Sequence, residues 1–251
     1  MTAVSGTLLT ITYVLVDDWF QHSSLRLLTG KRGAKTVFGD SEVIILPVTM
    51  DYLPFPGEIQ FLGFVRANYL ALFPESLGQS QFNRWACGLR LLVGELRKHW
   101  ALLLGVTFHA RFLLGAQPVP VVGYKRSKRR SDFAGSATYE VVSVACNSDI
   151  YGGKGSPGEI WQQEQHDSRD NRIWTPGRIN QKVQIPEGFD RWLNSIRGRI
   201  EGAFNEVQNT GRKTVNGSST HVIAKMASHA LRLVLRHFHG IDVLTLTAVL
   251  G

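Results

Sequence analysis

The chain has 251 residues, of which 43% are hydrophobic, so it is long enough to bury a core in one large domain or two modest ones. Its 28 Lys and Arg residues exceed its 20 Asp and Glu residues, and the formal net charge of +8 favours an acidic partner, either nucleic acid or an anionic membrane. No uncharged apolar run approaches the ~20 residues that span a bilayer, so we expect nucleic acid and no membrane.

Targeting signals and cysteine content indicate the cellular compartment of a protein. Residues 1–20 lack the basic n-region of a secretory signal peptide. The only cysteines are Cys87 and Cys146, and no CxxC motif or paired His accompanies them, so neither a disulfide framework nor a zinc site is predicted. These features predict a cytoplasmic protein.

Residues 1–105 have patterns typical of helices. The run 10–21 is largely apolar, and residues 40–42 (DSE) predict the start of another helix, because Ser or Asp caps a first turn and an acid there is favourable. Pro47 and the segment 54–57 (PFPG) are expected to punctuate the chain.

Two further helices are expected before residue 105. The pattern from Ile59 to Pro74 is helix-like, and the next helix is predicted from Gln79 through Trp100, where apolar residues recur at steps of three and four. Several short helices in a basic chain are compatible with a helix-turn-helix unit. The alternative is an ordinary set of amphipathic helices.

The pattern of apolar residues changes from helix-like to strand-like after residue 106. The segments 107–114 (TFHARFLL) and 138–146 (TYEVVSVAC) are rich in β-branched and apolar residues and predict strands. Between them lies a basic segment, 118–137, whose cations are Lys125, Arg126, Lys128, Arg129 and Arg130. Blocks of five or more like charges are often interaction segments, so we expect contact with DNA or RNA, with an ordinary solvated connection as the alternative.

Residues 152–182 contain few apolar residues and show no period, so they predict a loop or a partly disordered linker. Order returns after Pro186, where an apolar stripe from Phe189 to Val207 predicts a helix with a polar stripe beside it. Arg197 and Glu201 lie one turn apart on the polar stripe, and an ion pair at the core boundary is their simplest role.

The last predicted helix covers roughly residues 220–239 and ends at Gly240, a residue typical of helix C-termini. It carries four histidines, for which we predict surface positions, because no Cys or carboxylate cluster accompanies them as a metal site would require. These residues are His221, His229, His237 and His239.

Three blocks of the sequence together resemble bacterial insertion-sequence transposases of the DDE type, in particular insertion-sequence family nine-eight-two and its relatives. The first covers 38–74 (FGDSEVIILP…) and continues at 79–100; the second is 118–139 (PVPVVGYKRSKRRSDFAGSATY); the third covers 189–212 (FDRWLNSIRGRIEGAF…) and continues at 220–243. These blocks cover most of the chain.

The resemblance implies an α/β protein: a helical N-terminal DNA-binding region, 1–105, followed by an RNase H-like mixed-sheet domain, 106–251. Such a domain presents three carboxylates that hold two divalent ions, Mg²⁺ or Mn²⁺, about 4 Å apart for in-line attack on phosphorus. The implied partner is double-stranded DNA, especially the terminal inverted repeats of the element, and a homo-oligomer is an open alternative. The basic segment and Arg84 would contact phosphates.

The catalytic residues carry over only in part. The family has an Asp-Ser-x-Pro motif after its first strand, whereas this chain has GAQP at 115–118. No second catalytic Asp is matched between Lys154 and Pro186, so we predict an internal gap near 152–185 and an incomplete RNase H-like domain. Arg197 and Glu201 match the family's helical Arg-x-x-x-Glu pattern, which makes Glu201 the surviving catalytic and metal-binding acid.

Two classes of function follow. The chain is either a transposase-lineage protein with an incomplete catalytic site, or a non-catalytic DNA-binding protein that occupies element ends; a decayed fragment that does not fold stably is a third alternative. An active site would need substitute carboxylates near Glu201, and we predict that none of the local acids supplies one. These acids are Asp132, Asp149, Asp167 and Asp170.

Overall fold

The chain forms two compact units. The computed structural model describes residues 2–24, 38–53, 55, 57–74, 78–106, 111–114, 148–152, 159–175, 188–189, 191–195 and 215–243. The helical unit comprises Met1–Leu104 and Thr214–Gly251, and the sheet unit comprises Gly105–Lys213. Helices together with a small parallel sheet place the chain in the α/β class in its broad sense.

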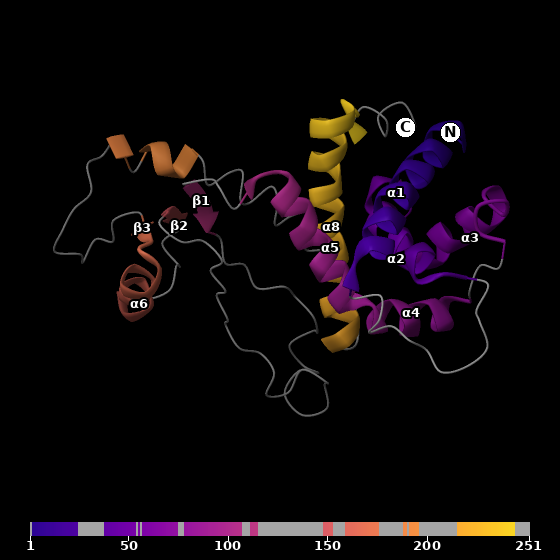
Figure 1. The fold of residues 1–251 in the computed structure, drawn as a ribbon, viewed down its shortest axis with the longest axis horizontal. Coiled ribbons are helices and arrows are strands. Elements are labelled where there is room, and N and C mark those ends of the chain that lie inside the picture. Colours follow the sequence, from indigo (N-terminus) through magenta and orange to yellow (C-terminus); the bar gives the residue numbers. More distant parts are fainter. Residues whose placement is uncertain are drawn as a thin grey trace. The chain divides into compact units, whose positions relative to one another are not determined.

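The helical unit confirms that the N-terminal region is helical (Figure 1). Its elements are α1 (Thr2–His22), α2 (Asp40–Thr49), the 3₁₀ helix η2 (Met50–Tyr52), α3 (Glu58–Asn68), α4 (Gln79–Gly88), α5 (Arg90–Leu103) and α8 (Val215–His239).

Helix α2 begins where the sequence predicts. The Glu42 carboxylate accepts a hydrogen bond from the Gly39 backbone N–H, which the helix itself leaves unsatisfied. The Ser41 hydroxyl donates to Asp17 Oδ1 at 2.7 Å and so links α2 to α1. Pro47 does not end the helix, contrary to the punctuation expected there, because α2 continues to Thr49 and its residues 43–46 are almost completely buried against neighbouring helices.

The single helix predicted from Gln79 through Trp100 is wrong in one respect, because it is divided into α4 and α5. The division falls at Leu89 (φ −90°, ψ 1°), directly after Gly88, a residue type that weakens helices. In a helix-turn-helix unit, a turn of about three or four residues joins the two helices. One residue separates α4 from α5 and ten separate α3 from α4, so neither of these pairs has such a turn.

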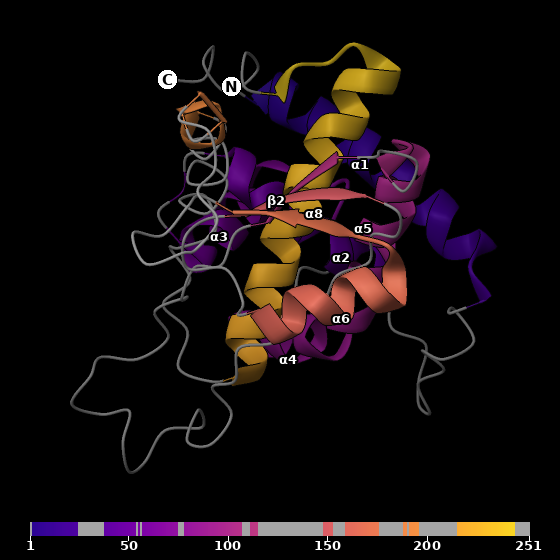
Figure 2. The ribbon, with the colours of Figure 1, turned by 90° about the vertical axis from the view of Figure 1, so that its left-hand side faces the viewer.

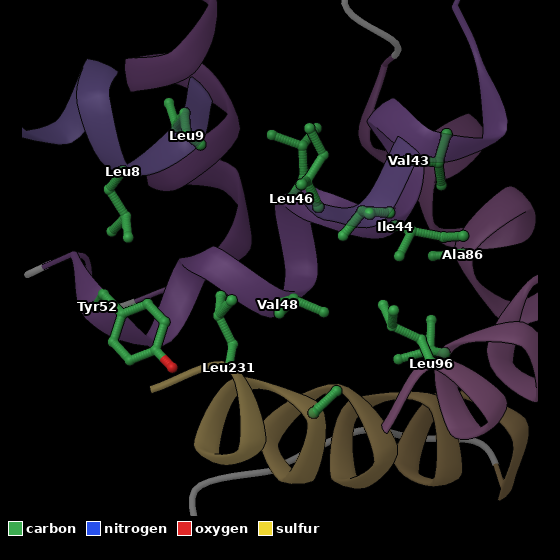
Figure 3. Packing of buried hydrophobic residues seen from close by; sticks show 14 of the residues in the cluster. Leu8, Leu9, Val43, Ile44, Leu46, Val48, Tyr52, Ala86, Leu96 and Leu231 are labelled. Carbon is green, nitrogen blue, oxygen red and sulfur yellow. The ribbon is translucent and has the colours of Figure 1, made fainter. Parts of the chain in front are cut away.

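Helix α8 packs against α5 and α2 in the helical unit. Apolar residues of α8 recur at helical spacing from Ala224 to Leu235, and Ala227, Leu231 and Leu235 are fully buried. In Figure 3, Leu231 points toward Val48 and Tyr52. The structure therefore corrects the predicted domain boundaries: α8 does not belong with the rest of 106–251, because its apolar stripe is buried in the core formed with the N-terminal helices.

The sheet unit contains three parallel strands in the order β1-β2-β3: β1 (Arg111–Leu114), β2 (Asp149–Gly152) and β3 (Arg172–Trp174). Helix α6 (Glu159–Arg169) connects β2 to β3, which makes a βαβ unit. Figure 2 shows the strands side by side, with α6 alongside them.

The predicted linker over 152–182 is wrong where α6 and β3 lie. Helix α6 has the sequence EIWQQEQHDSR, which is rich in helix-forming Glu and Gln but has no clear apolar stripe, so periodicity did not reveal it. Strand β3 has only three residues, too few for a period. The predicted strand 107–114 is confirmed over 111–114, whereas 138–146 and the basic segment lie outside the described residues. The described strands are all parallel, so they do not include the antiparallel part of a mixed sheet.

Tyr52 provides a test of the packing between η2 and α8. Its hydroxyl donates to the Ser228 carbonyl, and burial raises its pKa from 10.0 to about 12. The folded state favours the neutral phenol, so this contribution to stability is complete below pH 10 and is lost as the pH rises toward 12. Over that window we expect the free energy of unfolding of the wild type to fall more steeply than that of Tyr52→Phe, by up to about 1.4 kcal/mol per pH unit. Urea unfolding followed by circular dichroism measures both slopes, and equal slopes would contradict the prediction.

Candidate nucleic-acid interface

Of the predicted site residues, the structure describes only Arg84. It lies on α4 with an exposed side chain, and its Nε–H donates to the Ser80 carbonyl at 3.3 Å. The neighbouring Trp85 faces inward, because its indole N–H donates to Asp40 Oδ1 at 2.6 Å. Helix α4 therefore presents the Arg84 guanidinium outward while Trp85 holds the helix to α2.

The other predicted site residues lie outside the described residues. They are the DNA-binding residues Lys125, Arg126, Lys128, Arg129 and Arg130, and the catalytic pair Arg197 and Glu201. Of the four candidate substitute acids, Asp132 also lies outside, whereas Asp149, Asp167 and Asp170 are described.

Asp149 lies on β2, the central strand, and is held by two residues of β3. The parallel register places Asp149 directly beside Arg172. Arg172 Nε lies 2.9 Å from Asp149 Oδ1, and its Nη2 lies 3.3 Å from Oδ2. The Trp174 indole N–H donates to Oδ1 at 2.9 Å. Both carboxylate oxygens of Asp149 are therefore engaged by N–H donors.

The junction between α6 and β3 fixes this arrangement. Asp170 has a φ of +54°, a left-handed conformation that turns the chain sharply after α6. The next residue, Asn171, is 1% exposed; its Oδ1 accepts from the Ser148 N–H at 3.2 Å, and its amide donates to Gln165 at 3.3 Å. One buried amide thus connects α6 to the residue that precedes β2, which sets the register that pairs Asp149 with Arg172.

Four aromatic rings gather beside this pair. Tyr151 and Trp192 meet edge to face with ring centroids 5.1 Å apart. Phe189 lies 5.5 Å from both Trp192 and Trp174, measured between ring centroids. We call Tyr151, Trp174, Phe189 and Trp192 the aromatic cluster. The side chains of Asp149 and Tyr151 share one face of β2, because residues two apart on a strand point the same way.

A groove of about 510 Å³ adjoins the aromatic cluster at Trp174. Its walls come from α6 and β3, and most of the lining side chains carry hydrogen-bonding groups. They are Gln162, Gln163, His166, Asn171, Arg172, Ile173 and Trp174. A groove of this volume lies within the range of small-molecule sites, roughly 300–1,000 Å³.

The described acids do not fit the two-metal site that the resemblance implies. Asp149 is engaged by Arg172 and Trp174, and Asp167 accepts from Gln163 at 2.9 Å and lies 3.3 Å from His166. Within the described ranges, no three His, Cys, Asp or Glu side chains gather closely enough to hold a metal ion. In the described parts of the chain, no helix combines the length and the hydrophobicity that are needed to span a bilayer.

No protein-family model matches the chain, and no curated protein or solved structure matches it either.

The sequence did not indicate the Asp149 pair or the aromatic cluster. Arg172 and Trp174 occur two residues apart, as two side chains on one face of a strand do, but the strand was not predicted. Phe189 belongs to the apolar stripe of a predicted helix, and helical periodicity does not show that Phe189 and Trp192 approach Tyr151, which lies 38 residues or more away in the sequence. The parallel pairing of β2 with β3 brings the side chains of these two strands together, and tertiary packing adds Phe189 and Trp192.

We expect Asp149 and Arg172 to stabilise the sheet jointly. In a double-mutant cycle with Asp149→Asn and Arg172→Gln, we expect a coupling free energy of about 1 kcal/mol, kept small because the Arg172 side chain is 66% exposed. Hydrogen exchange of the β3 amides measures this coupling free energy. Glu95 and Lys98, an exposed pair 2.7 Å apart on α5, form the control, with an expected coupling of about 0–0.5 kcal/mol. Equal couplings in the two pairs would contradict a specific role for Asp149.

Proposed function

We propose that this chain is a DNA-binding protein of the DDE transposase lineage that occupies duplex DNA, such as element ends, without cutting it. The observation that carries the proposal is the distribution of positive charge. Of the net charge of +8, the sheet unit contributes +5, from 16 Lys and Arg against 11 Asp and Glu, and the basic segment concentrates five cations within residues 125–130. Such a block neutralises DNA phosphates and supplies affinity without reading sequence.

The RNase H-like assignment of the sheet unit is part of this proposal. Three parallel strands with a helical crossover are compatible with the parallel part of an RNase H-like sheet. The loss of catalysis is supported by two observations: residues 115–118 lack the acid that the family pattern has there, and Asp149 is already bound by Arg172. A metal ion that bound Asp149 would have to displace its charge-assisted, bidentate contact with Arg172. The proposed DNA binding implies a cytoplasmic location in a bacterial cell.

Neutralising part of the basic segment should weaken duplex binding more than the same charge change elsewhere. We expect the triple variant Lys128→Gln, Arg129→Gln, Arg130→Gln to lower affinity for a duplex at least about tenfold, and to reduce the slope of log affinity against log salt by about 2–3, since each lost phosphate contact removes about 0.9. Fluorescence anisotropy over a series of salt concentrations measures both quantities.

The matched control neutralises three exposed cations of the helical unit, Arg66, Lys98 and Arg236, and so makes the same change in net charge. We expect this variant to retain most of the affinity and most of the salt slope. Equal losses in the two triple variants would show that overall charge, rather than the basic segment, causes binding.

We also expect the chain to lack strand-cleavage activity. In a nicking and strand-transfer assay on duplex DNA with candidate element ends, with Mg²⁺ or Mn²⁺, we expect no product from the wild type above the level of Glu201→Ala. A metal-dependent nuclease serves as the positive control for the substrate. Cleavage by the wild type that disappears in Glu201→Ala would mean that other carboxylates complete the site, and the proposed loss of catalysis would be wrong.

A further inference from the structure

The aromatic cluster presents much of its ring surface to solvent. Trp174 is 38% exposed and Trp192 is 43% exposed, although both rings contact Phe189. In contrast, Leu193, the neighbour of Trp192, is 3% exposed. The segment 191–195 therefore buries a leucine while it leaves an indole in water, and exposed aromatic surface gathered from separate segments is typical of a binding site.

Polar contacts beside the aromatic cluster fix the orientation of the Trp174 ring. Its indole N–H is bound to Asp149, whose charge is balanced by Arg172 in the same register. The ring is thereby fixed in orientation without leaving an unbalanced negative charge beside it. Such a fixed ring can stack on a planar ligand at a small cost in conformational entropy.

Charge complementarity indicates the kind of ligand. Beside the exposed rings lies a cation, Arg191, which directly precedes Trp192 and is itself exposed. A planar, uncharged group attached to an anionic backbone satisfies both features, and an unpaired base of single-stranded DNA is such a group. Bases within a duplex do not fit, because their faces are already stacked on one another.

We propose that the aromatic cluster is a stacking platform for unpaired bases of single-stranded DNA, with Trp192 and Trp174 as the rings that contact the bases. The adjoining groove would place Gln162, Gln163 and His166 beside a base that stacks on Trp174. This inference deepens the proposed function and rests on it for the choice of DNA as the partner. The stacking platform differs from the proposed duplex-binding function in its site and in the form of DNA that it binds, because the duplex phosphates would be bound by the basic segment.

The test measures binding of the full chain to a fluorescent 20-residue oligothymidine by anisotropy. We expect Trp192→Ala to weaken binding about tenfold or more, and Trp192→Phe, which keeps a ring, to weaken it less than about threefold. Phe238→Ala is the matched control, because Phe238 is a 51% exposed aromatic residue on α8 in the other unit, and we expect no change. Affinity that is unchanged in Trp192→Ala, or lowered equally in Phe238→Ala, would overturn the proposal.

A second measurement uses the wild type alone and so does not depend on whether Trp192→Ala folds. An abasic oligonucleotide of equal length has the same phosphates but no bases, and we expect it to bind at least about tenfold more weakly than oligothymidine and to leave tryptophan fluorescence unquenched. Equal binding of the two strands would overturn the stacking platform.

The outcomes for the two proposals are distinguishable. Loss of duplex affinity in the Lys128, Arg129, Arg130 triple variant bears on the proposed function, whereas Trp192→Ala should keep its duplex affinity. Base-dependent binding of oligothymidine without duplex binding would support the platform and reject the duplex-binding function. Duplex binding with no preference for oligothymidine over the abasic strand would do the reverse.

Discussion

The packing of α8 onto α5 and α2 is the interaction on which the organisation of the chain depends. Leu231 and Leu235 of α8 are fully buried, as are Leu96 and Trp100 of α5. The contact closes a core between residues more than 120 positions apart, and burying side chains of this size stabilises by roughly 1.5–3 kcal/mol each before the entropy of closing the chain is counted. The sheet unit is consequently an insertion in sequence, entered after Leu104 and left before Thr214.

This arrangement gives the two units different constraints. The helical unit has a continuous hydrophobic cluster, to which Tyr52 adds a hydrogen bond between η2 and α8. In the sheet unit, short strands are fixed mainly by polar contacts: the Asn171 amide, the Asp149 pair with Arg172, and the turn at Asp170. Polar contacts of this kind specify one register, because a shift of one residue would separate Asp149 from Arg172 and turn every side chain to the opposite face.

The same polar contacts connect the fold to its proposed functions. The Asp149 carboxylate accepts a hydrogen bond from the Trp174 indole and is paired with Arg172. These contacts would orient the ring for stacking, and they would have to be broken for Asp149 to bind a metal ion. Duplex DNA at the basic segment and unpaired bases at the aromatic cluster would then be recognised by different physical means, charge in the first case and stacking in the second.

The sequence by itself determined the helical character of residues 1–105, the start of α2 at Asp40 and the strand at 111–114, because capping, periodicity and apolar composition are local properties. The amino-acid composition also determined the positive net charge of the chain. Only the tertiary structure decided that α8 joins the N-terminal helices, and that Asp149, Trp174 and Trp192 gather at one place. Those contacts join segments that are distant along the chain, and β3 is too short and α6 too polar to have a period, so no local pattern encodes them.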